Sequence, residues 1–344
     1  MAGQFRFSFG PWNIHEGADP FGPPVRRSFT FAQKLRFYKR LGYDGIQFHD
    51  DDVVPNLNAL RPAQVVAAAR RVRRLIEDAG LTPEFVAPRL WEDPRTVDGA
   101  YTANSARDRH YAWERSKRAI DIAHALGTRR IVLWLAREGT YMREVKDARL
   151  AVERIAAAVN MMLAYDPNIR ILIEPKPNEP MDQAYIPTAG HAIGLAAMTA
   201  DPARVGVLIE SAHAILAGLD PSDEMAYALA HKKLWGVHLN DQNGLKFDED
   251  RAFGTVNLRR AFDQVRVLDQ NDYGRNGEWV GMDVKAIRTQ KRADSTRHLR
   301  NSREIFLRLL RISRSLSEAK LQEYIARRDY EEFERYLMRR LMGD

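Results

Sequence analysis

The chain has 344 residues, 45% of them hydrophobic, and a formal net charge of +7. It contains no cysteine, which excludes disulfides and thiolate metal sites, so any metal must bind oxygen and nitrogen ligands. The first residues lack the basic start and apolar core of a secretory signal, and no run reaches the roughly 18 apolar residues of a membrane span. We therefore expect a cytoplasmic protein with no membrane partner.

The excess positive charge lies near the C-terminus. Residues 285–344 contain 16 Lys or Arg and 9 Asp or Glu, an excess of 7 that equals the net charge of the whole chain. A nucleic-acid enzyme more often places its basic surface around its site, whereas the candidate site described below is acidic. We predict no nucleic-acid partner and interpret the basic tail as a solvated or subunit-packing surface.

Short apolar runs alternate with helical patterns along the chain. The predicted strands are 6–12, 45–48, 84–87, 130–135, 169–173, 205–209, 234–239 and 279–282. The predicted helices between them are 31–41, 62–79, 105–126, 145–163, 188–198, 222–230 and 258–265. Gly42, Gly80 and Gly127 fall just past three of these helices, where a left-handed C-cap favours glycine. Eight strands alternating with helices predict an α/β fold, a (β/α)8 TIM barrel.

A doubly wound open sheet is the alternative fold, but it would place a glycine-rich phosphate-binding turn after an early strand, and the sequence has none. A long helix over 295–317 and one or two amphipathic helices over 321–342 follow the last strand, and barrel closure does not need them. We therefore predict a barrel catalytic domain at residues 1–315 and a C-terminal helical arm at residues 316–344. The arm would pack on the barrel or on another subunit.

Acidic and imidazole side chains follow the last four predicted strands. Glu174 and Lys176 stand among prolines, which cannot continue a central strand. The ends of barrel strands are where such folds keep their active sites. An oxygen-rich set with two imidazoles suits hard or borderline divalent metals. The candidate ligands are Glu174, Glu210, His213, His238, Asp248, Asp250 and Asp283.

Several motifs resemble those of xylose isomerase, also called glucose isomerase, of the shorter bacterial class. The matching stretches are 48–52, 133–134 with 137–139, 173–180, 187–192, 231–234 and 246–250. The resemblance covers roughly residues 5 to 310 in unbroken order.

This resemblance implies a metal-dependent aldose–ketose isomerase, which opens a cyclic sugar and shifts a hydride between C1 and C2. It also implies a homodimer or homotetramer with two divalent ions per subunit, which would be Mn²⁺, Co²⁺ or Mg²⁺. The first ion would bind Glu174, Glu210, residue 238 and Asp283. The second would bind Glu210, His213, Asp248 and Asp250, with Glu210 bridging the two.

The resemblance also implies roles for other residues. Lys176 would stabilise negative charge on the aldehyde oxygen. His49, oriented by Asp52, would assist ring opening, and Asp250 would help to move a proton between the substrate oxygens. The implied substrate-binding residues are Trp12, Phe21, Arg89, Trp91 and Trp134, with Phe21 reaching in from a neighbouring subunit.

Three positions depart from the family pattern. His238 stands where the family has an aspartate, and a Glu, Glu, His, Asp ligand set resembles that of rhamnose isomerase and the ketose epimerases. Arg89 replaces a small polar residue, and Ser211-Ala212 replaces Thr-Gly. The alternative is thus a related barrel acting as an epimerase, as a lyase on a modified sugar, or as a non-catalytic sugar-binding protein.

Overall fold

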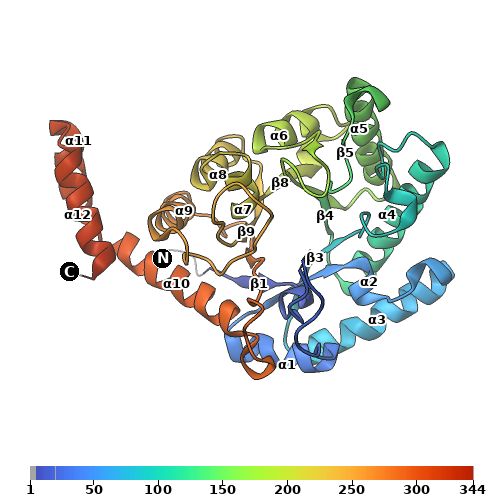
Figure 1. Cartoon of the computed structure of the whole chain (residues 1–344), viewed down its shortest axis with the longest axis horizontal. Helices are drawn as coiled ribbons and strands as arrows, with labels where there is room; N and C mark the ends of the chain where they lie inside the picture. The colour runs from blue at the N-terminus through green and yellow to red at the C-terminus, as the bar shows by residue number, and fades with distance from the viewer. Residues whose placement is uncertain (1–4, 20, 344) are drawn as a thin grey trace.

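Eight parallel strands close into a barrel in the computed structural model, which describes residues 5–19 and 21–343. Neighbouring strands follow the order β1-β10-β9-β8-β6-β4-β3-β2, and β1 pairs with β2 to close the ring (Figure 1). The barrel strands are β1 (Phe7–Phe9), β2 (Gly45–His49), β3 (Thr82–Ala87), β4 (Arg130–Trp134), β6 (Arg170–Glu174), β8 (Val205–Glu210), β9 (Leu234–Leu239) and β10 (Val280–Met282). The predicted TIM barrel is confirmed.

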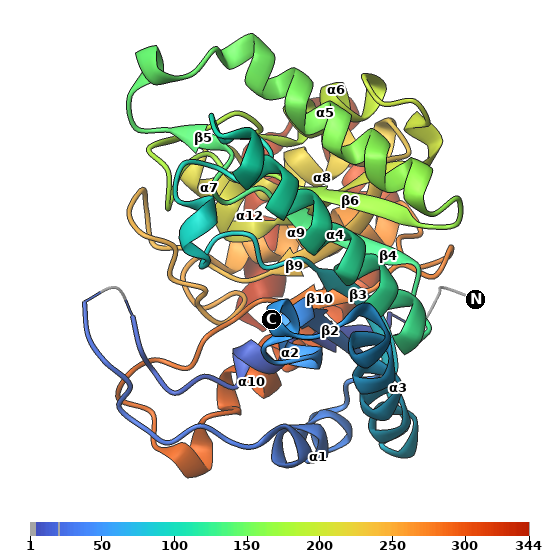
Figure 2. The same ribbon diagram turned by 90° about the vertical axis from the view of Figure 1, so that its right-hand side faces the viewer.

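Helices surround this barrel (Figures 1 and 2). They are α1 (Phe31–Leu41), α2 (Asp50–Val53), α3 (Pro62–Asp78), α4 (Ala106–Leu126), α5 (Ala148–Tyr165), α6 (Ala189–Ala197), α7 (Ser211–Leu216), α8 (Pro221–Ala230), α9 (Leu258–Gln270), α10 (Arg297–Ser315), α11 (Glu318–Arg327) and α12 (Tyr330–Met342). Every helix predicted between strands is present. The short helices α2 and α7 escape prediction, because so few turns give no readable periodicity. None of the helices within the described ranges combines the length and hydrophobicity that a membrane crossing requires.

The first strand is shorter than predicted. It ends at Phe9, and Pro11–Asn13 form a 3₁₀ turn instead of continuing the ladder. Pro11 has no N–H to donate to a neighbouring strand, and the backbone N–H of Gly10 donates to the side chain of Asn13 at 2.8 Å. This turn aims Trp12 and Asn13 at the carboxyl end of β10.

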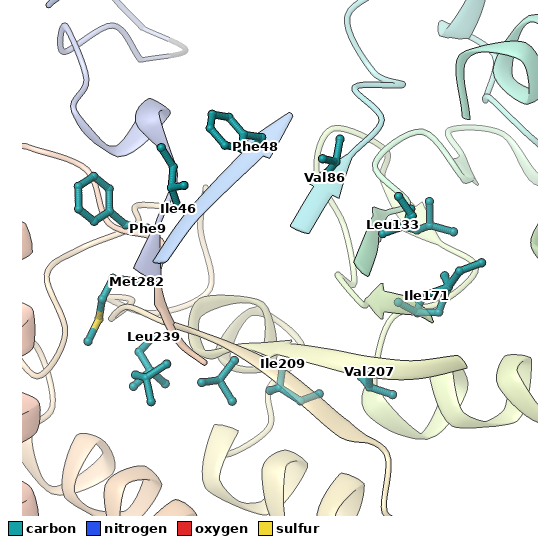
Figure 3. Close-up of a cluster of buried hydrophobic side chains, with 14 of the residues drawn as sticks. Phe9, Ile46, Phe48, Val86, Leu133, Ile171, Val207, Ile209, Leu239 and Met282 are labelled. Carbon is teal, nitrogen blue, oxygen red and sulfur yellow. The ribbon is translucent and has the colours of Figure 1, made fainter. Parts of the chain in front are cut away.

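Alternating side chains build two apolar layers. The outward layer packs between the strands and the helices and includes Ile46, Phe48, Leu133, Ile171 and Ile209 (Figure 3). The inward layer fills the barrel itself, and its buried members are Phe85, Ala87, Val132, Leu172 and Leu208.

Two further short strands, β5 (Gly139–Thr140) and β7 (Gln183–Ala184), pair antiparallel outside the barrel. They join the loops that follow β4 and β6. After the barrel, α10 packs along α9, and α11 and α12 project away from the barrel beyond it (Figure 1). The two arm helices contact each other, and α12 also touches α10.

His298, near the start of α10, ties this helix to the turn after β1. Its Nε2–H donates to the carbonyl of Asn13 at 2.8 Å, and the Asn13 side chain donates to Asp283 at 2.6 Å. Burial lowers the pKa of the His298 imidazole from 6.5 to about 4. The folded protein thus holds His298 neutral at a pH where the unfolded chain would protonate it.

We predict that His298 contributes an acid-sensitive part of the stability. Because its pKa is lower in the folded state, its contribution is complete above about pH 6.5 and is lost as the pH falls towards 4. The loss should reach about 3 kcal/mol, at about 1.36 kcal/mol per pKa unit. Urea unfolding at pH 7 and pH 4.5 should show a smaller pH effect in His298→Gln than in wild type. His110→Gln, at an exposed position, should behave like wild type, and equal acid sensitivity in all three proteins would contradict the prediction.

Candidate metal centre

The candidate ligands meet at the carboxyl ends of the barrel strands. Glu174 ends β6 and Glu210 ends β8, while His238 lies one residue before the end of β9. Asp283 directly follows β10. His213 lies on α7, and Asp248 and Asp250 lie in the loop between β9 and α9. All seven line one cavity of about 820 Å³, so the structure brings together every ligand that the sequence suggests.

Glu210 stands at the centre of this cluster. Ligand atoms within 4.8 Å of one another form three groups, and each group contains Glu210. The groups are Glu174, Glu210 and His213; Glu210, His238 and Asp283; and Glu210, Asp248 and Asp250. A carboxylate shared in this way can bridge two neighbouring ions.

His238 faces three carboxylates through one ring nitrogen. Its Nδ1 lies 3.3 Å from Glu174 Oε1, 3.5 Å from Glu210 Oε2 and 3.9 Å from Asp283 Oδ2. Trp12 and Asn13 donate hydrogen bonds to the other oxygen of Asp283, at 2.9 and 2.6 Å. The 3₁₀ turn after β1 therefore fixes Asp283 with its free oxygen towards His238.

His213 joins Asp248 to Glu210. Its Nε2 lies 3.2 Å from Glu210 Oε1 and 3.2 Å from Asp248 Oδ2. Asn240 also belongs to this cluster, although the sequence analysis missed it. Its Nδ2 donates to Glu210 at 2.8 Å and to Asp250 at 3.2 Å. Its only sequence signal is a position two residues after His238.

The surroundings of these acids shift their pKa values in opposite directions. Burial raises the pKa of the Glu210 carboxyl well above its usual range, and Asp248 and Asp283 add to the effect. Burial together with the charge of Asp248 raises the pKa of Asp250 to about 7. Burial would also raise the pKa of Glu174, but the imidazoles of His238 and His213 lower it to about 2. The acids cannot all be ionised unless added positive charge neutralises them.

Two lysines supply part of that charge. Lys176 Nζ lies 3.0 Å from Asp248 and 3.1 Å from Glu179, and Lys285 forms an ion pair with Asp250. Burial lowers the pKa of both ammonium groups, but the facing carboxylates outweigh it, so each pKa lies above the usual range. Lys285 is absent from the sequence-based set, because only the fold brings it to Asp250.

The residues fit a divalent metal ion. His213 Nδ1 and Asp248 Oδ1 are buried and have no hydrogen-bond partner among the described residues. Five carboxylates and two imidazoles form a donor set of oxygen and nitrogen, which suits Mn²⁺, Co²⁺ or Mg²⁺. Two lysine ammonium groups alone leave this set negatively charged.

Aromatic rings form one wall of the cavity. The rings of Trp91 and Trp134 are 4.5 Å apart, and His49 lies 4.3 Å from Trp12 and 5.2 Å from Trp91, all between centroids. Lys176 Nζ lies 5.2 Å from the ring centroid of Trp134. The three predicted tryptophans thus line the same cavity as His49 and Lys176.

Arg89 lies beside His49 in the lining of the same cavity. Its Nη2 is 2.8 Å from His49 Nδ1, and its other nitrogens bind Asp51 at 2.9 Å and Glu92 at 3.0 Å. Asp52 Oδ2 is 3.2 Å from the same His49 nitrogen. Arginine can only donate, so the closer contact makes Nδ1 an acceptor and leaves the proton on Nε2.

Phe21 lies outside the cavity lining. Its side chain is 78% exposed, and its ring centroid is 5.4 Å from that of Phe247, in the loop that carries Asp248 and Asp250. Phe21 is thus an exposed aromatic beside this loop, and its reach into a neighbouring subunit stays a prediction.

Comparison with known proteins gives a family match and several similar folds. The family described as xylose isomerase-like TIM barrel matches residues 35–302. A D-tagatose 3-epimerase-like protein is 15% identical with a TM-score of 0.62, over 90% of this chain and 98% of that one. A xylose isomerase domain protein from Alicyclobacillus acidocaldarius is 14% identical with a TM-score of 0.60, over 89% and 99%. The 3-keto-D-glucoside 4-epimerase of E. coli is 16% identical with a TM-score of 0.59, over 88% and 99%. At these identities the structural likeness establishes the fold alone.

We predict that Arg89 fixes the tautomer of His49. In wild type the ring should be neutral with its proton on Nε2, because Arg89 donates to Nδ1. Arg89→Met removes that donor, so Nδ1–H should instead donate to Asp52. Long-range ¹H–¹⁵N correlation spectra of histidine-labelled protein distinguish the two tautomers, with His49→Gln assigning the signal. An Nδ1–H tautomer in wild type, or no change in Arg89→Met, would exclude this role.

Proposed function

Because the chain belongs to the xylose isomerase-like TIM barrel family, we propose that it is a metal-dependent aldose–ketose isomerase acting on a sugar. The observation that carries the proposal is the convergence of Lys176 and the Asp250–Lys285 pair on the candidate metal ligands in one cavity. A site that only binds sugar has no need for proton-transfer groups beside a metal centre. The family match supports this reading, and the individual sugar stays open.

We propose two metal sites. The first consists of Glu174, Glu210, His238 and Asp283, and the second of Glu210, His213, Asp248 and Asp250. When bound, the ions supply Lewis-acid polarisation of two neighbouring substrate oxygens. The close approach of all seven side chains to Glu210 or its neighbours supports both sites.

In the proposed reaction a hydride moves from C2 to C1 of the open sugar, and the proton on O2 moves to O1. The C1 aldehyde becomes an alcohol and the C2 alcohol becomes a ketone. Lys176 would donate a hydrogen bond to O1 as negative charge develops there. Asp250 would help to move the proton between the two oxygens as an acid–base group.

His49 and the tryptophans of the cavity would assist opening of the sugar ring and exclude water. His49 carries its proton on Nε2 when Arg89 occupies Nδ1, so its Nε2–H can donate a hydrogen bond to the ring oxygen as the ring opens. Trp12, Trp91 and Trp134 present apolar faces that keep water from the carbon centres during the hydride shift.

An epimerase is the second candidate. Epimerisation removes a proton from one face of a carbon and returns one to the other, so it needs two acid–base groups. The cavity contains two lysine–aspartate pairs, Lys176–Asp248 and Lys285–Asp250. Two of the similar structures are described as an epimerase or epimerase-like protein.

We also propose that the chain forms a homodimer or homotetramer and that the arm, residues 316–344, packs on another subunit. The exposed side chains of Ile325, Tyr330 and Met342 on α11 and α12 support this role. A small-molecule sugar remains the proposed substrate.

The test of function is a panel of pentoses, hexoses and deoxysugars incubated with the metal-loaded protein, with the products identified. We expect an aldose–ketose pair as the interconverted product. Lys176→Ala should retain metal but lose about 10²–10³ in turnover, as for loss of one oxyanion donor. Lys39→Ala removes a surface lysine paired with Asp44 and should match wild type. Products differing only at one stereocentre would favour the epimerase, and full turnover by Lys176→Ala would remove that residue from the mechanism.

His238 should shift metal preference towards later first-row ions. Imidazole suits Mn²⁺ and Co²⁺ better than Mg²⁺, so calorimetry should give a larger Mn²⁺-to-Mg²⁺ affinity ratio for wild type than for His238→Asp. A histidine ligand must be neutral, and its reference pKa is about 6.5 against about 3.9 for aspartate. On acidification, wild type should therefore lose metal at a higher pH than the variant. Identical ratios and pH profiles would show that His238 is not a ligand.

Phe21 should matter for assembly. If it contacts a neighbouring subunit, Phe21→Ala should lower the mass measured by light scattering at micromolar concentration or lower activity in the assembled protein. Leu245→Ala, which trims another exposed apolar side chain, is the matched control. A fully active wild-type monomer would contradict the proposal.

A further inference from the structure

A second cavity, of about 490 Å³, lies at the amino end of the barrel. Its lining includes Arg130 and Arg170, the first residues of β4 and β6, and Trp235, the second residue of β9. Glu174 and His238 of the metal centre lie at the other ends of β6 and β9. The two cavities therefore open at opposite ends of the barrel.

The cavity brings two guanidinium groups together without a carboxylate partner. Arg130 and Arg170 are directly paired in the β4–β6 register, so their side chains start from adjacent positions on the same face. Among the described residues, no carboxylate oxygen lies within 4.0 Å of a nitrogen of either group, so neither forms an ion pair. Burial and the nearby charge of Arg130 lower the pKa of Arg170, with Glu278 opposing them. Two like charges are thus held close together.

Both guanidinium groups keep unused hydrogen-bond donors. Arg130 Nη2 donates to the carbonyl of Gly277 at 2.9 Å, but its Nη1 is buried and has no partner within the described residues. The guanidinium of Arg170 lies over the ring of Trp235, with Cζ 3.8 Å from the ring centroid. Its N–H groups make no hydrogen bond to another described residue, so they are available for an oxyanion.

The two acidic groups in the lining are engaged elsewhere. Glu278 Oε2 accepts hydrogen bonds from the backbone N–H groups of Gly274 and Asn276, at 3.1 and 3.0 Å. Asp272 Oδ2 lies 3.9 Å from Arg275. Neither therefore takes up the free donors of the two arginines.

The indole of Trp235 packs closely against Gly206 of β8. A Cβ at Gly206 would lie 2.2 Å from the indole, so only glycine lets the ring pack against β8. Leu172, Leu229 and Leu234 also line the cavity. The cavity thus has two arginine side chains on one side and apolar side chains beside them.

We propose that this cavity binds a small multivalent oxyanion, carried by a phosphate ester or an organic polycarboxylate, between Arg130 and Arg170. The unpaired donors of the two paired arginines, the position of Arg170 over Trp235 and the cavity that both arginines line carry the inference. It does not depend on the proposed reaction at the other end of the barrel.

Calorimetric titration of the metal-loaded full chain with inorganic phosphate and with citrate, at constant ionic strength, tests the proposal. Wild type should bind at least one of them, and the better ligand distinguishes a phosphate ester from a polycarboxylate. Arg170→Gln should weaken binding roughly ten- to hundredfold, as expected for a lost hydrogen bond to a charged group. Arg130→Lys, which keeps the charge but loses the planar fork, should also weaken it.

Arg71→Gln is the matched control, because it removes one exposed arginine of α3 far along the chain from the cavity. This variant should leave the anion affinity unchanged. Any anion that binds at the candidate metal centre would add the same signal in every variant, so it cannot produce a difference between them. Equal affinity in Arg170→Gln and Arg71→Gln, or no binding by wild type at millimolar concentration, would overturn the proposal.

Discussion

Crowded carboxylates at one end of the barrel are the constraint on which the candidate site depends. Four acids and two imidazoles lie around Glu210, and burial strengthens every repulsion between the carboxylates. Lys176, Lys285 and the amide of Asn240 each offset part of this repulsion. The remaining negative charge makes the cluster a candidate cation site and not merely a set of buried acids.

Distant parts of the chain hold this cluster in place. The turn after β1 fixes Asp283 through Trp12 and Asn13, and His298 on α10 holds the carbonyl of Asn13. The turn after β1 and helix α10 therefore both support the candidate ligand Asp283. A change at α10 can reach the metal centre through two hydrogen bonds, which links the stability of the fold to the geometry of the site.

A second charged network stands behind His49. Arg115 binds the buried Asp50 and also contacts Asp51, and Asp51 in turn binds Arg89. Arg89 then reaches His49, so alternating charges extend from α4 to the imidazole. The two main departures from the family pattern, His238 and Arg89, therefore affect different parts of the site. His238 changes the set of candidate metal ligands, and Arg89 contacts the histidine beside the aromatic wall.

The sequence by itself determined the barrel, because the period of its apolar residues and its turn signals are local properties. It also indicated the seven candidate ligands, since Glu174 and His238 lie at strand ends that a parallel barrel must gather at one edge. It could not indicate Lys285, Asn240 or the contact of Arg89 with His49, because these depend on side-chain directions across elements far apart in the chain. The early end of β1 was also not predicted. The Gly10 N–H donates to the Asn13 side chain instead of to a neighbouring strand, so β1 ends at Phe9. The pairing of Arg130 with Arg170 needed the strand register, which only the closed barrel decides, because closure sets the stagger of every neighbouring strand.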